Sequence, residues 1–406
     1  MAERGYRGFG IRKRPAGAGR HIPDPPPERV TRQLERAEAV IAEPFVGITT
    51  DGRRITGLFP LEQTGLSTAP LKDAADAFIN TLSTQQRDKA SFAIDSPQWR
   101  LWQNNASFAL RHGVGLEGAS AAERTAALNL VQVSLSARGF QAVRTTMKLN
   151  ELLSQITGNT DELGEWLYWL SIFGTPSLAE PWGWQLDGHH LAVSCFVLGD
   201  QMVLTPSFLG AEPNYADRGP DAGLRAFAEE ERQGLELIRA LSPAQQQRAI
   251  LYASMLSKDL PRERNDPNDG RVWAGAFHDN RVIPYEGIGG AELSAGQRDL
   301  LRRLMEVYVG RVRQGHDKVN MAEVDRRLDQ THFSWIGGTD DDSVFYYRVH
   351  SPVILIEFDH HHGVFLDNDE PEKFHIHTVV RTPNGNDYGR DLLRQHYEKD
   401  HRPTTQ

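Results

Sequence analysis

The stretch Pro181-Trp182-Gly183-Trp184-Gln185-Leu186-Asp187-Gly188-His189-His190 runs directly into the apolar segment 191–198. It places two tryptophans, a carboxamide, a carboxylate and two imidazoles side by side, a mixture that a buried core does not require. The apolar segment that follows predicts a buried strand. We therefore expect this stretch to be the entry to a central strand and one wall of a functional site.

A second histidine motif, His375-Ile376-His377, is the predicted partner of the first. Side chains alternate along a strand, so both imidazoles would project from one face. Such a pair gives a metal ion two neutral nitrogen ligands, and a third ligand from another strand leaves a position open for water or substrate. The predicted ligands are His189, His190, His375 and His377. Only one of His189 and His190 should reach the centre unless the backbone turns at Gly188.

Other histidines follow a strand that is expected to end before them. His360-His361-His362 lies between Asp359 and Gly363 in a predicted loop, and we expect solvated imidazoles there rather than metal ligands. Replacement of His361 is accordingly expected to leave the metal content unchanged. The His-x-His pair, taken alone, also fits ordinary core or surface histidines.

Four polar side chains are candidate catalytic residues: Glu357, Asp187, His350 and Arg381. A carboxylate in the apolar run 353–358 costs roughly several kcal/mol unless it is paired, which makes Glu357 a candidate ligand or general base; an outward-facing position is the alternative. Asp187 would orient an imidazole or occupy a turn with Gly188. Arg381 would bind a substrate carboxylate or phosphate, or pair with Glu357.

Aromatic and amide side chains near the first histidine pair are the predicted substrate-binding residues: Trp182, Trp184, Gln185 and Trp102. Trp102 belongs to a polar and aromatic cluster with Trp99, Asn104, Asn105, Arg111 and His112. This cluster is predicted to be either a wall of the site or a surface loop that two tryptophans anchor.

The composition excludes several classes of partner and site. A chain of 406 residues with 39% apolar and 24% charged residues is typical of a globular protein with a full core. Its formal charge of −9 argues against nucleic acid or an anionic membrane as a partner. With Cys195 as its one cysteine, the chain forms no internal disulfide and no cysteine-based zinc cluster. The basic start lacks the apolar run of a signal peptide, so we expect a cytoplasmic location; the oligomeric state is not predicted.

The order of periodic segments predicts an α+β fold with an antiparallel sheet. Residues 1–65 are predicted to form an N-terminal arm, loosely packed over residues 1 to about 30, and a short hairpin over 45–60 that turns at Asp51-Gly52. Residues 66–406 are predicted to form one α+β domain. Helical spacing dominates 71–160 and returns at 224–241 and 293–312, which predicts a large helical layer. Strands are expected mainly in 190–210, with a tight turn at Gly199-Asp200, and in 332–381.

Several motifs resemble those of the DUF3500 family of uncharacterised proteins, in order and over residues 71–397. They are Trp182 to His190, Thr205 to Pro213, His278-Asp279-Asn280, Pro284-Tyr285-Glu286-Gly287, Trp335-Ile336-Gly337-Gly338, Tyr347-Arg348-Val349-His350-Ser351-Pro352 and His375-Ile376-His377. The resemblance implies no established activity. Similar family members tend to have Asn where this chain has Phe374, and a shorter connection where it has 360–370.

These features favour a metal-dependent enzyme that acts on a small organic molecule. Hydrolysis or a lyase step is the commonest chemistry of a histidine-bound metal, because the ion acidifies water and polarises a carbonyl group. The expected cofactor is a divalent metal, with zinc favoured. Two alternatives stay open: a non-heme iron or copper oxidoreductase, and a non-catalytic protein that binds a small ligand between its tryptophans.

Overall fold

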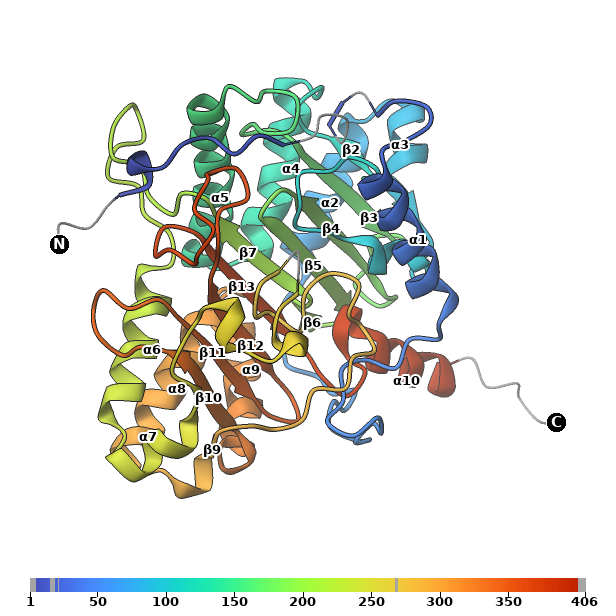
Figure 1. Cartoon of the computed structure of the whole chain (residues 1–406). Coiled ribbons are helices and arrows are strands. Elements are labelled where there is room, and N and C mark those ends of the chain that lie inside the picture. Colours follow the sequence, from blue (N-terminus) through green and yellow to red (C-terminus); the bar gives the residue numbers. More distant parts are fainter. Residues whose placement is uncertain (1–4, 15–18, 21, 267–268, 401–406) are drawn as a thin grey trace.

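A mostly antiparallel sheet forms the centre of the molecule in the computed structural model, which describes residues 5–14, 19–20, 22–266 and 269–400 (Figure 1). Within these residues the sheet has thirteen strands in the order β1-β3-β4-β5-β7-β13-β12-β11-β10-β8, with β2 on β3, β6 on β5 and β9 on β10. The β1–β3 and β8–β10 pairs are parallel, and the others are antiparallel. The predicted α+β class is confirmed.

The strands of the first half are β1 (Ser91–Phe92), β2 (Val114–Gly115), β3 (Tyr168–Phe173), β4 (Trp182–Gly188), β5 (Leu191–Leu198), β6 (Gln201–Val203) and β7 (Ser207–Ala211). Those of the second half are β8 (Ile250–Tyr252), β9 (Ile288–Gly289), β10 (His332–Gly337), β11 (Phe345–His350), β12 (Leu355–His360) and β13 (Ile376–Arg381). The two expected strand regions are found, with the tight turn after Leu198. The sequence prediction missed β3 and did not recognise that the opening stretch is itself strand β4.

Pairing of β7 with β13 joins the two halves of the sheet. Gly210 lies opposite His377, and Ala211 lies opposite Ile376. A Cβ on Gly210 would lie 3.0 Å from the His190 ring and 3.1 Å from the His377 ring. Glycine at this position therefore lets two imidazoles from different halves of the chain approach each other across the sheet.

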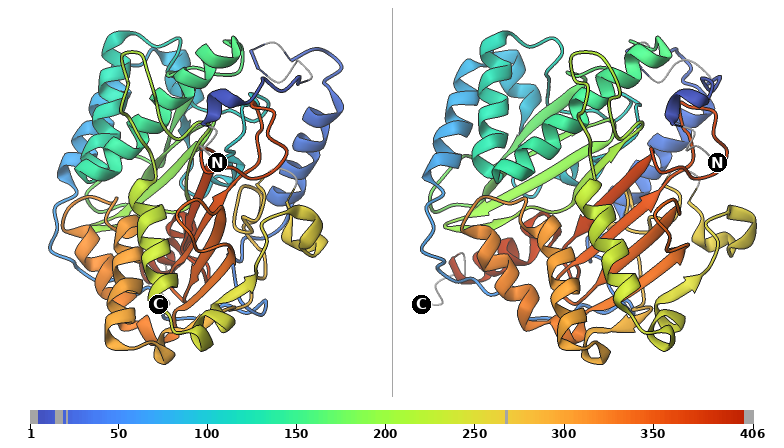
Figure 2. Two further views of the ribbon diagram at one scale, coloured as in Figure 1. Left: turned by 60° about the vertical axis from the view of Figure 1, so that its left-hand side comes forward. Right: turned by 90° about the vertical axis from the view of Figure 1, so that its left-hand side faces the viewer.

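Most helices cover one face of the sheet, as Figure 2 shows most clearly in its right-hand view, whereas the helices that contain Ala37 and Leu392 pack on the opposite face. The helices are α1 (Glu28–Ala42), α2 (Ala69–Thr81), α3 (Thr84–Ala90), α4 (Ala121–Ser134), α5 (Ala137–Thr157), α6 (Ala228–Ala240), α7 (Pro243–Ala249), α8 (Ala295–Val309), α9 (His316–Arg326) and α10 (Arg390–Asp400). The apolar stripes of α2, α4, α5, α6, α8 and α9 share one core with alternate residues of the strands. None of the described helices is both long and apolar enough to cross a bilayer.

Irregular segments cover much of the opposite face. Their apolar side chains include Ile48, Trp99, Trp102, Val272 and Tyr388, which pack with the strand residues Ala192, Phe208, Leu355 and Val379. Successive strand side chains alternate between the two faces. Residues in step with Val379, among them His375, His377 and Arg381, therefore lie on the face that these irregular segments cover.

The N-terminal segment differs from the prediction in two respects. The hairpin expected over 45–60 is wrong: Thr49 instead forms an isolated parallel bridge with Val282, because the partner of this extended backbone comes from a distant segment. Residues 5–14 are docked rather than loose. Ile11 bridges Leu366, and the backbone N–H of Arg12 donates to the carbonyl of Phe365 over 2.8 Å.

Candidate metal centre

The turn between β4 and β5 separates the adjacent histidines. His190 has a positive φ of 60°, an uncommon conformation for a residue other than glycine. Its N–H donates to the carbonyl of Asn104 and its carbonyl accepts from Gly210, both over 2.8 Å. The His189 ring stacks on His190 at 3.8 Å but bonds through Nδ1 to Asn150 Oδ1 of α5, over 2.7 Å. The backbone turn thus sends His190, rather than both histidines, into the centre.

Three imidazoles from the two halves of the sheet meet at one point. His375 Nε2 lies 3.2 Å from His190 Nε2 and 3.1 Å from His377 Nε2. All three residues are buried, and one nitrogen of each lies within 4.8 Å of the others, so the group can hold a metal ion. Burial lowers the pKa of His375 to about 3 and holds those of His190 and His377 well below their usual value. The three rings are therefore neutral at pH 7, as metal ligands must be.

The hydrogen bond that His375 Nδ1 makes determines the tautomer of this ring. Nδ1 lies 2.7 Å from the carbonyl oxygen of His362, which only accepts, so Nδ1 carries the proton and Nε2 presents its lone pair inward. One lone pair cannot accept hydrogen bonds from both His190 and His377. A cation satisfies all three nitrogens together. The two spacings from His375 Nε2 are close to the N···N separation of about 3.3–3.4 Å that bonds of about 2.0–2.1 Å impose on a tetrahedral ion.

A buried carboxylate stands behind His377. Asp269 Oδ1 lies 3.6 Å from His377 Nδ1 and accepts from Asn104 Nδ2 over 2.6 Å. Burial, reinforced by the nearby Asp266, raises the pKa of Asp269 to about 7. Since the carbonyl of Asn104 also holds His190, this one residue is connected to two of the three imidazoles.

His361 is not the solvated side chain that the sequence suggested. It is fully buried, and its ring lies 4.4 Å from His377 and 4.8 Å from His375. Its Nδ1 lies 3.3 Å from Asp359 Oδ2, while its Nε2 has no hydrogen-bond partner among the described residues. Burial raises the pKa of Asp359 to about 7. The β-ladder continues beyond the apolar run, because the N–H of His361 donates to the carbonyl of His375 over 2.8 Å.

A column of contacting side chains, Arg14, Phe365 and His189, connects the N-terminal arm to the centre. The Arg14 guanidinium lies 3.8 Å from the Phe365 ring, and Phe365 lies 5.3 Å from His189. His189 in turn stacks on His190. Glu212 anchors the same connection by accepting the backbone N–H groups of residues 364–366. The position of His190 therefore depends partly on residues that precede the sheet in the sequence.

Comparison with known proteins identifies the family of this chain. The family model described as "Protein of unknown function (DUF3500)" covers residues 64–390. The chain belongs to the DUF3500 family. No curated protein and no solved structure matches it.

Glu357 of this DUF3500 chain lies on the same face as the three histidines but is fully bonded. It accepts from Trp273 N over 3.0 Å, from Ala274 N over 2.7 Å and from Tyr346 Oη over 2.6 Å. The outward-facing alternative is wrong, because the side chain is fully buried. Its pairing with Arg381 is also wrong. These bonds attach the irregular segment 272–274 to the sheet, and they leave the carboxylate poorly placed to act as a base.

Glu357→Gln is expected to destabilise the protein by roughly 1–3 kcal/mol, because an amide NH2 then faces backbone and hydroxyl donors in a buried site. Urea unfolding measures this change. Metal content should match wild type, since Glu357 contacts none of the three imidazoles through the bonds described above. Wild-type stability combined with lost metal would instead make this carboxylate part of the centre.

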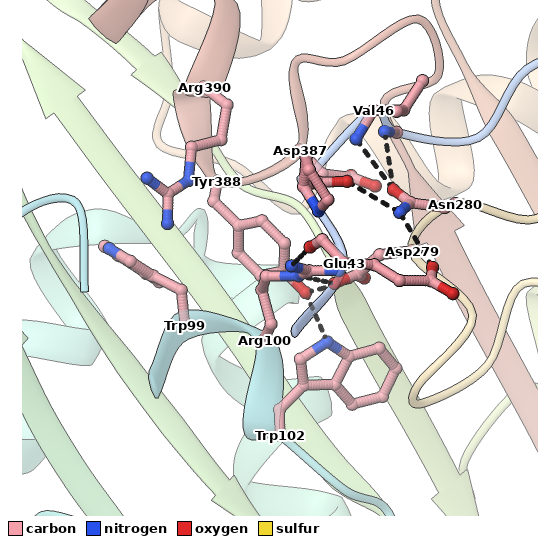
Figure 3. A network of polar contacts seen from close by, with 12 residues as sticks. Glu43, Val46, Trp99, Arg100, Trp102, Asp279, Asn280, Asp387, Tyr388 and Arg390 are labelled. Atoms are coloured by element: carbon pink, nitrogen blue, oxygen red, sulfur yellow. Dashed lines mark hydrogen bonds and ion pairs between the residues drawn. The ribbon is translucent and has the colours of Figure 1, made fainter. Parts of the chain in front are cut away.

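Arg381 and Trp102 belong to a buried polar network around Asp279 rather than to the histidine centre. Arg381 donates to Asp279 Oδ1 over 2.6 Å and to Asp387 Oδ2 over 2.7 Å. Burial would lower the pKa of Arg381, but the two carboxylates outweigh it and raise the value. Figure 3 shows Trp102 donating to Tyr388, with Arg100 beside Asp279. Arg381 is thus saturated by protein carboxylates and is not available to a substrate anion.

The remaining candidates also lie away from the three imidazoles. Asp187 neither orients an imidazole nor serves only in a turn: it forms a buried ion pair of 2.5 Å with Arg111. Trp182 and Trp184 pack into the core on the helical face, where their indole N–H groups donate to Ser177 O and Ser134 Oγ, each over 3.0 Å. Gln185 donates to Trp99 O and Ser194 Oγ, each over 2.9 Å. His350 lies at the C-terminal end of β11, where it aligns across the sheet with Arg381 rather than with His377.

A cavity of about 130 Å³ in the DUF3500 chain lies on the helical face. Its lining includes Phe59, Met202, Tyr308, Val324, Ile354 and Val380, and none of the histidines of the centre. The hollow and the reactive side chains are therefore in different places. We assign the candidate site from the chemistry of the imidazoles, because an apolar hollow by itself performs no reaction.

Proposed function

We propose that the protein is a metal-dependent enzyme that acts on a small organic molecule, most simply as a hydrolase or lyase. One observation carries the proposal: His375 Nε2 lies 3.2 Å from His190 Nε2 and 3.1 Å from His377 Nε2, and the tautomer of His375 directs a lone pair toward these two nitrogens. Three histidine ligands with a free position are typical of catalytic zinc sites, whereas structural sites use four protein ligands.

Each residue of the centre has a distinct role in this proposal. His190, His375 and His377 would hold the ion, which supplies a Lewis acid that acidifies water and polarises a carbonyl group. His361, oriented by Asp359, would hold and transfer a proton at Nε2. This assignment replaces Glu357, whose oxygens are occupied by Trp273, Ala274 and Tyr346.

Elemental analysis of protein purified without a histidine tag tests the proposal, followed by ester, amide and lactone hydrolysis assays before and after chelation. Stoichiometric zinc with chelator-sensitive turnover supports a hydrolase or lyase. Stoichiometric iron or copper would replace that reaction class with the oxidoreductase alternative. Protein that neither retains nor takes up a metal would overturn the proposal in favour of the ligand-binding alternative.

Asp269→Asn is expected to weaken metal binding by about 10–100-fold, the usual effect of losing a carboxylate behind a histidine ligand. The physical reason is that the Asp269 carboxylate, 3.6 Å from His377 Nδ1, favours the tautomer with the proton on Nδ1. In that tautomer the lone pair of Nε2 faces the ion. Competition with a chromophoric chelator measures the dissociation constant. Asp299→Asn on the exposed side of α8 is the matched control and should bind like wild type. Equal affinities for all three proteins would contradict the role of Asp269.

A further inference from the structure

A second polar cluster lies on the same sheet face, away from the histidine centre. Its members are Ser334, Arg348 and His350 from β10 and β11, covered by Tyr285 and His332. Ser334 pairs with Arg348, and His332 pairs with His350. Across the sheet, His377 aligns with Tyr346 of β11 rather than with His350. The four residues from Tyr346 to His350 correspond to about 13 Å along the strand. The cluster is therefore a separate place in the fold.

Several buried polar atoms of this cluster lack a hydrogen-bond partner among the described residues. They are Ser334 Oγ, Arg348 Nη1, Tyr285 Oη and both ring nitrogens of His350. Ser334, Arg348 and His350 are each only 1% exposed. Buried polar groups in folded proteins are nearly always satisfied, so such a concentration calls for an occupant that supplies the missing hydrogen bonds.

The covering residues leave an approach from solvent. Tyr285 is partly exposed and stacks on the partly exposed His332 at 4.6 Å. The Tyr285 ring also lies 4.7 Å from the His350 ring, edge to face. The side chains of Tyr285 and His332, rather than packed backbone, thus separate the cluster from solvent.

The local charge and the balance of donors select the kind of molecule. Three guanidiniums surround the Trp273 ring at 4.4–5.5 Å, namely those of Arg264, Arg281 and Arg348. Three carboxylates oppose them: Glu286, which accepts from both Arg264 and Arg348, Glu357, and Asp266 near Arg281. Arg348 nevertheless keeps Nη1 without a partner among the described residues, so a charged donor remains for a ligand. Each unpartnered residue can donate a hydrogen bond, because Arg348 only donates and the two hydroxyls and the neutral His350 each carry one proton.

We propose that this cluster is a binding site for a small oxyanion, such as phosphate or the carboxylate of a small acid. Arg348 Nη1, Ser334 Oγ and Tyr285 Oη would donate to the oxygens of the anion, and His350 would add one N–H. Charge-assisted hydrogen bonds of this kind are the strong ones in a buried site. The site is independent of the proposed metal chemistry.

The test is calorimetric titration of the full-length protein with sodium phosphate and, separately, sodium acetate, at constant ionic strength against chloride. Wild type is expected to bind at least one of the two saturably. Binding of one but not the other identifies the class of oxyanion. Ser334→Ala and His350→Phe should each weaken binding about tenfold or more, as expected for losing a hydrogen bond to a charged group. Ser334→Ala is the milder change and keeps the test decisive if His350→Phe does not fold.

His375→Ala is the control for anion binding at the histidine centre and should bind the anion like wild type. Absence of binding in wild type would overturn the proposal and leave water as the occupant of the cluster. Binding that persists unchanged in both Ser334→Ala and folded His350→Phe would also overturn it, since the anion would then occupy another site.

Discussion

His375→Ala is expected to lower the metal content of the purified protein from about one ion per chain to background, because a site with three protein ligands loses a third of its donors and the lone pair that His362 orients. His190→Ala and His377→Ala should have the same effect. The centre lies beside a large core, so circular dichroism should show a folded protein in each case. Elemental analysis at matched protein concentration gives the result.

His189→Ala is the matched control, since His189 bonds to Asn150 and stacks beside the centre without joining it. It should retain most of its metal. Unchanged metal content in all three ligand variants would refute the shared centre, and loss in His189→Ala alone would move the site toward α5.

Arg381→Met is expected to destabilise the protein by about 3–5 kcal/mol, the usual cost of breaking a buried charge pair from one side. The guanidinium is fully buried between Asp279 and Asp387, and its removal leaves both carboxylates with fewer donors. The free energy of unfolding from urea titration measures the loss. Bound metal should be unaffected in the fraction that folds.

Arg232→Met is the matched control on α6. Arg232 also bonds to two carboxylates, Glu229 and Glu236, but its side chain is 56% exposed, so its loss should cost less than about 1 kcal/mol. Equal stabilities for Arg381→Met and wild type would mean that the buried network contributes nothing to folding.

Local periodicity predicted the part of the site that one strand determines. The spacing of two between His375 and His377 placed both imidazoles on one face, and the alternation of side chains along a strand predicted that only one of His189 and His190 reaches the centre. The same periodicity, extended from Glu357 through Asp359 to His361, would have placed His361 on that face. The prediction ended the strand too early because it used apolar residues as the signal.

Pairing between distant segments could not be predicted in this way. Strand β4 is buried on both faces, so its sequence did not show that Trp182 and Trp184 face the helices. Glu357 is satisfied by backbone N–H groups of Trp273 and Ala274, which lie in an irregular segment without periodicity. Arg381 likewise finds Asp279 through the tertiary fold, about a hundred residues away in sequence.

Docking of the N-terminal arm and binding of an ion at the histidine centre are thermodynamically coupled. Tyr6 and Phe9 pack on Phe374, and Ile11 and Arg12 pair with residues 365–366, so the arm covers both positions where the chain departs from the family pattern. The Arg14 column then reaches His190. Linkage is reciprocal: whatever the docked arm adds to the affinity for an ion, the ion adds to the stability of the docked arm. Protease sensitivity near the N-terminus would accordingly report the occupancy of a centre formed more than a hundred and seventy residues later in the chain.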